Sequence, residues 1–236
     1  MSAVPSPLSW QAYYSEQSRQ CKDSRLKDFF DSGVVDPDTP LNEVPFVALD
    51  FETTGLNPQE HGIVSVGMVP FTLSRIRCQQ ASHFIVKPRQ TLLSKSITFH
   101  GITHSDVHGA PDLDDVLHEI LPKLANQVVV VHYRQIERDF LNSALMARLQ
   151  EPLFFPVIDT MTLEEQILRK RRSLLDKIFG SRSRQSLRLP DIRERYGLPR
   201  YNLHHAMTDA LATAELLQAQ VAHHFDERAP ISQFWC

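Results

Sequence analysis

The sequence has few of the features that mark disulfide-bonded, membrane-spanning or repeat proteins. Its 236 residues include only three cysteines, widely spaced and odd in number, which indicates neither a disulfide framework nor a zinc site. No run approaches the ~18 consecutive apolar residues of a membrane span. We find no internal repeat, and the first residues lack the basic start and apolar centre of a signal peptide. We therefore expect a cytoplasmic protein with no membrane partner.

An overall excess of positive charge is absent too. Lysine and arginine number 25 against 28 acids, and the net charge is -3. The 42% hydrophobic and 22% charged content is typical of a globular chain, long enough here for one domain with a sizeable core. The charge is uneven, however, because residues 169–188 carry eight basic side chains and one acid. This basic segment is either a phosphate-binding surface or a solvated helix face.

Two acids lie at the end of the first predicted strand. The apolar run 44–49 predicts a buried strand, and Asp50 and Glu52 follow it. Because side chains alternate along a strand, the two carboxylates lie on the same side and repel each other. A divalent metal ion would compensate, and carboxylate oxygens suit Mg²⁺ or Mn²⁺. The alternative is an edge strand whose acids face solvent.

A second polar pattern opens a helix far downstream. His204 is expected in the loop before this helix and Asp209 about one turn into it. Apolar residues follow at helical spacing, at Ala210, Ala214, Leu217 and Val221. A carboxylate at Asp209 can bind metal while the loop histidine reaches the same site. His205 competes with His204 for that place.

Between these motifs, the run 128–131 predicts another buried strand, and the helix that begins at Gln135 carries acids in its early turns, Glu137 and Asp139.

With these residues the chain resembles the 3'-5' exonucleases of the DEDD superfamily, in the branch with a catalytic histidine (DEDDh). That branch includes the epsilon proofreading subunit of bacterial DNA polymerase III and ribonuclease T. The motif D-x-E-T-T-G is present at residues 50–55, and H-x-x-x-x-D is present at residues 204–209. Residues 99–103 match a recurrent loop of the family, and the resemblance covers roughly residues 44–222.

The resemblance implies a ribonuclease H-like α/β fold, with a mixed five-stranded sheet flanked by helices. It also implies two metal ions, Mg²⁺ or Mn²⁺, bound by Asp50, Glu52, Asp209 and a fourth acid. The H-x-x-x-x-D spacing selects His204, rather than His205, as the general base. An imidazole suits that task because its unperturbed pKa lies near neutral pH.

The second family motif departs from the usual H-N-A-x-F-D-x-x-F-L. Its anchors here are His132 and the pair 140–141, and both place Glu137 where the family has an aspartate. Asp139 is two residues out of register, a rotation of about 200° on a helix, so the two acids cannot both face the site. Glu137 is the predicted fourth ligand.

The same resemblance places the segment after the first acids against the terminal nucleotide. The implied substrate-binding residues are Thr53, Thr54, Gly55, Leu56 and His100. Gly55 permits close backbone approach. Ordinary core packing of Leu56 and a local hydrogen bond of His100 are the alternatives.

Three regions are expected: a helical extension and connector at 1–43, an exonuclease domain at 44–222 and a tail at 223–236. Further strands are predicted at 63–71, 75–86 and 153–158, and a short helix at 187–196. A helix at 112–121 is expected to end or kink at Pro122. The N-terminal helices carry large apolar residues that favour packing on the domain: Trp10, Tyr13, Tyr14, Leu26, Phe29 and Phe30.

The predicted function is a metal-dependent 3'-5' exonuclease that releases nucleoside monophosphates from single-stranded DNA. The alternatives are an exoribonuclease or short-oligonucleotide hydrolase, or a nucleic-acid binding module that has lost its nuclease. A further alternative is a polymerase accessory subunit with a replication or repair partner, for which Phe234 and Trp235 could anchor a docking peptide.

Overall fold

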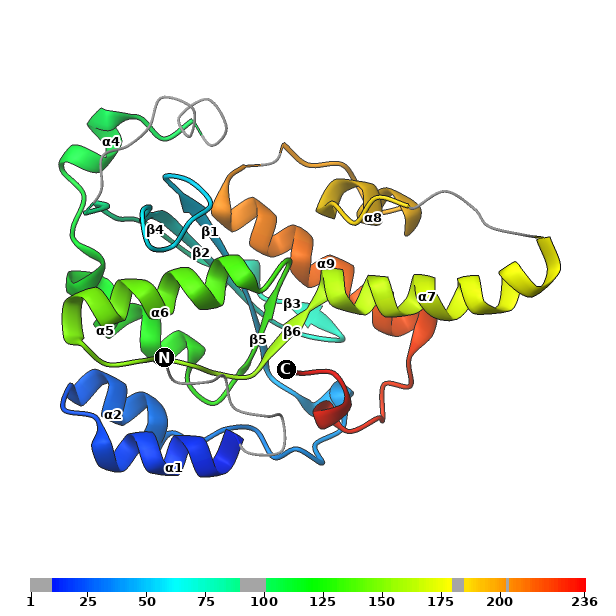
Figure 1. The fold of residues 1–236 in the computed structure, drawn as a ribbon, viewed down its shortest axis with the longest axis horizontal. Coiled ribbons are helices and arrows are strands. Elements are labelled where there is room, and N and C mark those ends of the chain that lie inside the picture. The colour runs from blue at the N-terminus through cyan, green and yellow to red at the C-terminus, as the bar shows by residue number, and fades with distance from the viewer. Residues whose placement is uncertain (1–9, 90–100, 180–184, 203) are drawn as a thin grey trace.

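A mixed sheet of six strands forms the centre of the protein (Figure 1). The computed structural model describes residues 10–89, 101–179, 185–202 and 204–236, with backbone alone for 171–179. The strands are β1 (Phe46–Thr53), β2 (Ile63–Thr72), β3 (Arg75–Ile76), β4 (Ser82–Ile85), β5 (Val128–Val131) and β6 (Val157–Asp159). Their order is β3-β2-β1-β5-β6, and β4 also pairs with β2.

Eight α-helices surround this sheet in the described part of the chain. They are α1 (Trp10–Gln20), α2 (Ser24–Asp31), α4 (His104–His108), α5 (Leu113–Leu124), α6 (Gln135–Leu149), α7 (Thr160–Phe179), α8 (Leu189–Arg195) and α9 (Ala206–His224). The apolar spacing of α9 buries one of its sides against β1 and β2. Helices α5 and α6 cover the opposite face, and α7 extends outward from the body (Figure 1). None of the described helices is both long enough and apolar enough to cross a membrane.

Strand direction determines which residues meet at the edge of the sheet. β1 runs antiparallel to β2 and parallel to β5, and β6 is parallel to β5. The carboxyl ends of β1, β5 and β6 therefore lie at one edge, where α/β sheets commonly bind ligands. Asp50 lies opposite Gly67 and Glu52 opposite Ser65, so both acids share the face of the sheet that α9 covers.

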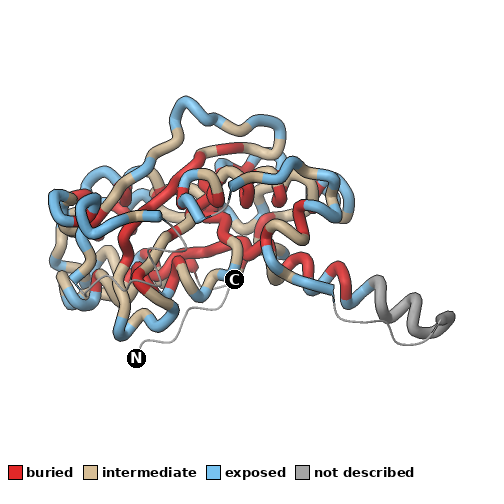
Figure 2. Tube along the Cα trace, turned by 90° about the horizontal axis from the view of Figure 1, so that it is seen from above, coloured by how far each residue is buried: buried red, intermediate tan, exposed pale blue. Residues whose placement is uncertain are grey.

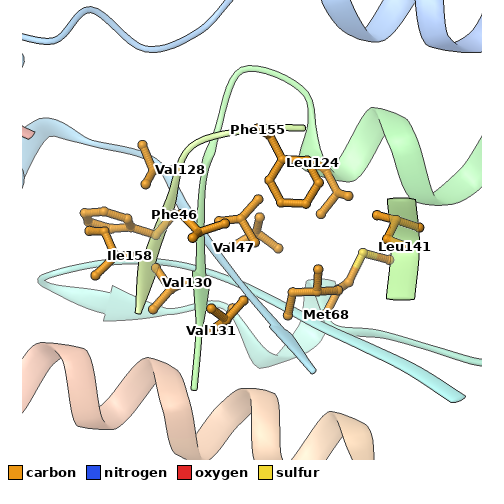
Figure 3. Close-up of a cluster of buried hydrophobic side chains, with 14 of the residues drawn as sticks. Phe46, Val47, Met68, Leu124, Val128, Val130, Val131, Leu141, Phe155 and Ile158 are labelled. Atoms are coloured by element: carbon orange, nitrogen blue, oxygen red, sulfur yellow. The ribbon is translucent and has the colours of Figure 1, made fainter. Parts of the chain in front are cut away.

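The core lies between the sheet and the helices on both faces. Figure 3 shows Val47 and Met68 from the sheet among Leu124, Leu141 and Phe155. Viewed from above, the buried residues form a continuous band through the body with exposed loops outside it (Figure 2). This rigid core supports the edge where the acids lie.

The N-terminal helices belong to the same core. Five of the six predicted apolar anchors lie in it, with Trp10 and Leu26 fully buried, and the sixth, Tyr13, is partly buried against it. Arg25 on α2 binds Asp114 on α5 at 2.8 Å. The C-terminal segment is packed as well, because Trp235 is buried and Cys236 exchanges two backbone hydrogen bonds with Val157, of 2.9 and 3.3 Å.

Three predictions of local structure were wrong in detail. The run 75–86 is divided into β3 and β4 by a short 3₁₀ turn at Cys78–Gln80, so the sheet has six strands rather than five. The strand expected at 153–158 begins only at Val157. Pro122 does not end α5, which continues to Leu124 because that side chain is buried in the core.

Candidate metal centre

The first two acids project from the end of β1 toward the start of α9. Gly67 lies opposite Asp50 on β2, and a Cβ atom built on Gly67 would meet the backbone carbon of Ala206 at 2.2 Å. Only glycine lets the first residue of α9 lie directly on β2. This contact brings the first turn of α9, and Asp209 with it, over Asp50.

The loop before α9 is shaped by Asp209 itself. The His204 backbone N–H donates to Asp209 Oδ2 at 2.8 Å, and His204 has a φ of 69°. Side-chain atoms of Glu52, His204 and Asp209 that could bind a metal ion all lie within 4.8 Å of one another. Thus residues from β1, the loop and α9, distant in sequence, converge on one point. His204 is exposed, which gives its ring access to a substrate.

Glu137 completes the acid cluster from α6. It is 2% exposed, and its charge is one of those that raise the pKa of Asp50. Asp139, in contrast, is exposed and contributes no such effect on Asp50. Because Glu137 and Asp139 lie two residues apart on a helix, they point in different directions. Glu137 is directed to the cluster and Asp139 to solvent.

Burial, together with neighbouring carboxylates for three of them, disfavours the charged forms of the four acids. Burial, followed by the charges of Glu137, Asp209 and Glu52, raises the pKa of Asp50 well above its usual value. Burial and then Asp209 raise the pKa of Glu52 from 4.5 to about 7. Burial also raises the pKa values of Glu137 and Asp209. A cation bound among these carboxyl groups would favour their charged forms.

Two orphaned oxygen atoms show that the cluster fits a cation. In the described part of the chain, Glu137 Oε2 and Asp209 Oδ1 are buried and have no hydrogen-bond partner. A buried oxygen without a partner is costly in a folded protein. Carboxylate oxygens are the ligands that Mg²⁺ and Mn²⁺ prefer, so the donor set fits such ions.

The loop after β1 is held by its own polar groups. The Thr54 N–H donates to Gly62 O at 2.9 Å, and Thr54 Oγ1 accepts from Gly62 N at 3.0 Å. Thr53 Oγ1 donates to Gly55 O at 2.7 Å. Thr54 is buried, and its amide and hydroxyl hold this loop together.

Gly55 is where the loop closes on itself. A Cβ atom at Gly55 would lie 2.3 Å from the ring of His61, so the close approach made here is to this ring. The closed loop presents Leu56 to solvent with 83% of its surface exposed. The core-packing alternative for Leu56 is therefore excluded.

His205 occupies a different place from His204. Its ring lies 4.6 Å from the ring of His83, whose Nε2 is 2.8 Å from Ser65 Oγ. A cavity of about 430 Å³ adjoins these side chains and His204, and Ile85 and Ile102 also line it. His205 thus packs at the wall of this cavity.

Two predicted features, His100 and the basic segment 169–188, lie wholly or partly outside the described residues. His100 lies outside the described residues. In the basic segment 169–188, the side chains of Arg169, Lys170 and Arg188 are described, and all three are exposed.

The sequence analysis did not identify Gly67, whose close contact with the Ala206 backbone determines how near α9 lies to the sheet. A signal was present, because an isolated glycine inside an apolar strand often marks the close approach of another backbone.

Comparison with known proteins gives one family for most of the chain. The sequence model of the Exonuclease family (RNase_T) matches residues 47–217. The PolC-type DNA polymerase III of Thermotoga petrophila is 29% identical over 179 residues, which is 76% of this chain and 12% of that protein. The DNA polymerase III subunit epsilon of Treponema pallidum is 25% identical over 181 residues, 77% of this chain and 78% of that protein. The chain thus spans only a small part of the PolC relatives it matches.

Solved structures show the same fold. The nuclease domain of 3'hExo, described as a DEDDh family member bound to rAMP, superimposes with a TM-score of 0.62 at 17% identity, covering 76% of this chain and 92% of that one. Exonuclease X in complex with 5' overhanging duplex DNA gives a TM-score of 0.55 at 20% identity, covering 79% and 99%. The ribonuclease H-like architecture is therefore confirmed. The matched family covers well over half of the residues, and the chain belongs to the exonuclease family, in agreement with the resemblance to its histidine branch.

Proposed function

We propose that this protein is a metal-dependent 3'-5' exonuclease that hydrolyses the terminal phosphodiester bond of single-stranded DNA and releases nucleoside monophosphates. The observation that carries this proposal is the convergence of Asp50, Glu52, Glu137 and Asp209 with His204 at the carboxyl end of β1. The DNA substrate is supported by the two relatives, which are both named as DNA polymerase III proteins.

The four acids would hold two divalent ions. When bound, such a pair stabilises the attacking and leaving oxygens of a phosphoryl group and lowers the pKa of a coordinated water. The orphaned oxygens of Glu137 and Asp209 would serve as ligands, and Asp50 and Glu52 would complete the set from β1. Glu137 takes the place of the family aspartate because its longer side chain still reaches the cluster from the first turn of α6.

His204 would accept the proton of the attacking water. Its ring is exposed and lies beside Glu52 and Asp209. The hydrogen bond from its backbone N–H to Asp209 fixes the loop and so keeps the imidazole near the cluster. An imidazole is a side chain commonly used as a general base.

The terminal nucleotide would lie against the loop after β1. Thr53, Gly55 and Leu56 border this place, and the exposed Leu56 side chain would contact the base. His100 would add a sugar or phosphate contact, as the resemblance implies. Arg169 and Lys170, on the outward part of α7, would bind phosphates farther along the strand.

The test is cleavage of single-stranded DNA and RNA that carry a label at the 5' end, with Mn²⁺ or with EDTA, by wild type and Asp50→Asn. We expect a ladder that shortens from the 3' end, with mononucleotide products, only for wild type with Mn²⁺. Faster cleavage of RNA than of DNA would replace the DNA substrate by RNA. No shortening of either strand would refute the proposal.

A further inference from the structure

Exposed apolar side chains occur close in sequence to the cluster acids. Of the described large hydrophobic residues, four are exposed, namely Leu56, Tyr133, Met146 and Met207. Three of these four lie within four residues of a cluster acid: Leu56 follows Glu52, Tyr133 precedes Glu137 and Met207 precedes Asp209. Solvent-exposed apolar groups next to a site commonly contact a ligand.

Tyr133 is unusual also in its backbone. It has a φ of 80°, a left-handed conformation that is an outlier for a bulky side chain. Glycine or asparagine adopts this conformation with less strain. Strained residues tend to occur at functional sites, where the surrounding structure holds them in place.

Asp159 supplies the restraint. This residue is 4% exposed, and its carboxylate accepts the Tyr133 N–H at 3.0 Å and the Arg134 N–H at 3.3 Å. The same carboxylate accepts the Met161 N–H at 3.0 Å at the start of α7. The turn after β5 is thereby fixed to β6 and α7, and 42% of the Tyr133 surface remains exposed.

The sheet order places Tyr133 and Leu56 on opposite sides of the acids. Leu56 lies in the loop that joins β1 to β2, and Tyr133 lies in the turn after β5. In the sheet, β2 and β5 are the two neighbours of β1, one on each side (Figure 1). If the terminal nucleotide lies at Leu56 and the scissile phosphate at the acids, the next nucleotide of the strand extends toward Tyr133.

We propose that Tyr133 stacks on the base of the second nucleotide from the 3' end and so determines which strand ends are bound productively. Stacking of a base on an aromatic ring tolerates any base, because every base has a π-face. Asp159 is then the positioning residue that holds the ring in place. This inference rests on the proposed exonuclease function.

The experiment compares two single-stranded DNA oligonucleotides that differ only at the second position from the 3' end, which carries either a base or an abasic sugar. The readout is kcat/KM for release of the first nucleotide, with Mn²⁺. We expect wild type and Tyr133→Phe to prefer the base-bearing strand roughly tenfold, the order of one stacked base. Tyr133→Gly should reduce this ratio to near one. Met146→Ala is the matched control, because Met146 has a similar exposure of 43% and lies nine residues after Glu137 on α6, and it should keep the wild-type ratio.

A stability measurement separates this role from a structural one. Because Gly and Asn tolerate the left-handed backbone, Tyr133→Gly and Tyr133→Asn should melt at or above the wild-type Tm while both lose the preference for a base. A clear loss of Tm in both variants, or an unchanged ratio in Tyr133→Gly, would overturn the inference. So would a wild-type ratio near one with normal cleavage, whereas no cleavage of either strand by wild type would refute the exonuclease function itself.

Discussion

At the scale of single residues, the fourth acid is where this chain departs from its family. Glu137 is buried and its charge acts on Asp50, whereas Asp139 faces solvent two positions later. The anchors His132 and Phe140 predict Glu137 as the fourth acid, because helical rotation turns Asp139 to another side of α6.

The matched pair Glu137→Gln and Asp139→Asn tests this assignment. We expect the first change to lower Mn²⁺-dependent cleavage by about 100-fold or more, since it removes a charged ligand, and the second to leave the rate within about twofold. Steady-state cleavage of a single-stranded oligonucleotide measures both. Loss of turnover in Asp139→Asn alone would show that the register is wrong.

Glu52 gives the metal-free protein a distinctive pH dependence. Its pKa is raised from 4.5 in the unfolded chain to about 7 in the fold, so its contribution to stability is full below pH 4.5 and is lost as the pH rises through 7. In EDTA, the Tm of Glu52→Gln should therefore rise relative to wild type between pH 4.5 and 8. The expected gain is about 2–4 °C for each kcal/mol of repulsion relieved.

The difference between the two proteins cancels the titration of groups on which Glu52 does not act, including the buried His132, whose pKa is lowered by burial. It includes the relief of the repulsion that Glu52 exerts on Asp50 and Glu137. With Mn²⁺ present, the order of the two Tm values should reverse, and wild type should melt higher than Glu52→Gln. Only wild type has a negatively charged carboxylate at position 52 to bind the ion. A Tm difference that does not change with pH in EDTA would contradict the raised pKa of Glu52.

At the scale of elements, the contact of α9 with β2 decides whether the acids meet. Gly67→Ala would place a methyl group 2.2 Å from the Ala206 backbone and push the start of α9 away from Asp50. We expect Mn²⁺ affinity to fall by about 10–100-fold in the protein that remains folded. Calorimetric titration measures this affinity.

Gly109→Ala is the control, because a Cβ atom there meets nothing within 4 Å. It should bind Mn²⁺ as wild type does. Equal affinity in Gly67→Ala would show that this contact does not position the site.

Most strands and helices that carry the site were predictable because their signals are local. The apolar run at 128–131 coincides with β5, and the helix predicted from Gln135 begins there. The errors arose where tertiary contacts outweighed local preference. Leu124 extends α5 past Pro122 by entering the core, and the turn at Cys78–Gln80 divides one predicted strand. The strained backbone of Tyr133 depends on Asp159, far along the chain, so no local pattern predicts it.

At the scale of the whole molecule, the N-terminal helices and the catalytic sheet form one core. The Trp10 ring is buried, and the Arg138 guanidinium of α6 lies 5.8 Å from its centroid. Helices α1 and α2 thus support the helix that carries Glu137, although they lie outside the matched residues 47–217.

Trp10→Ala should therefore destabilise the whole protein. Removal of a buried tryptophan costs about 3–5 kcal/mol, which lowers the Tm on the order of 10 °C in a chain of this size. Thermal unfolding followed by circular dichroism measures it, with the exposed Gln11→Ala as control. A Tm within about 2 °C of wild type would mean that the helices pack on the domain without stabilising it.

The central claim is that the four acids form a metal centre. Calorimetric titration of Mn²⁺ into EDTA-treated protein, with a deoxynucleoside monophosphate present, tests it most directly when wild type and Asp50→Asn are compared. We predict two bound ions per wild-type chain and a large loss of binding in Asp50→Asn. The absence of Mn²⁺ binding by wild type, or equal binding by both proteins, would contradict this account.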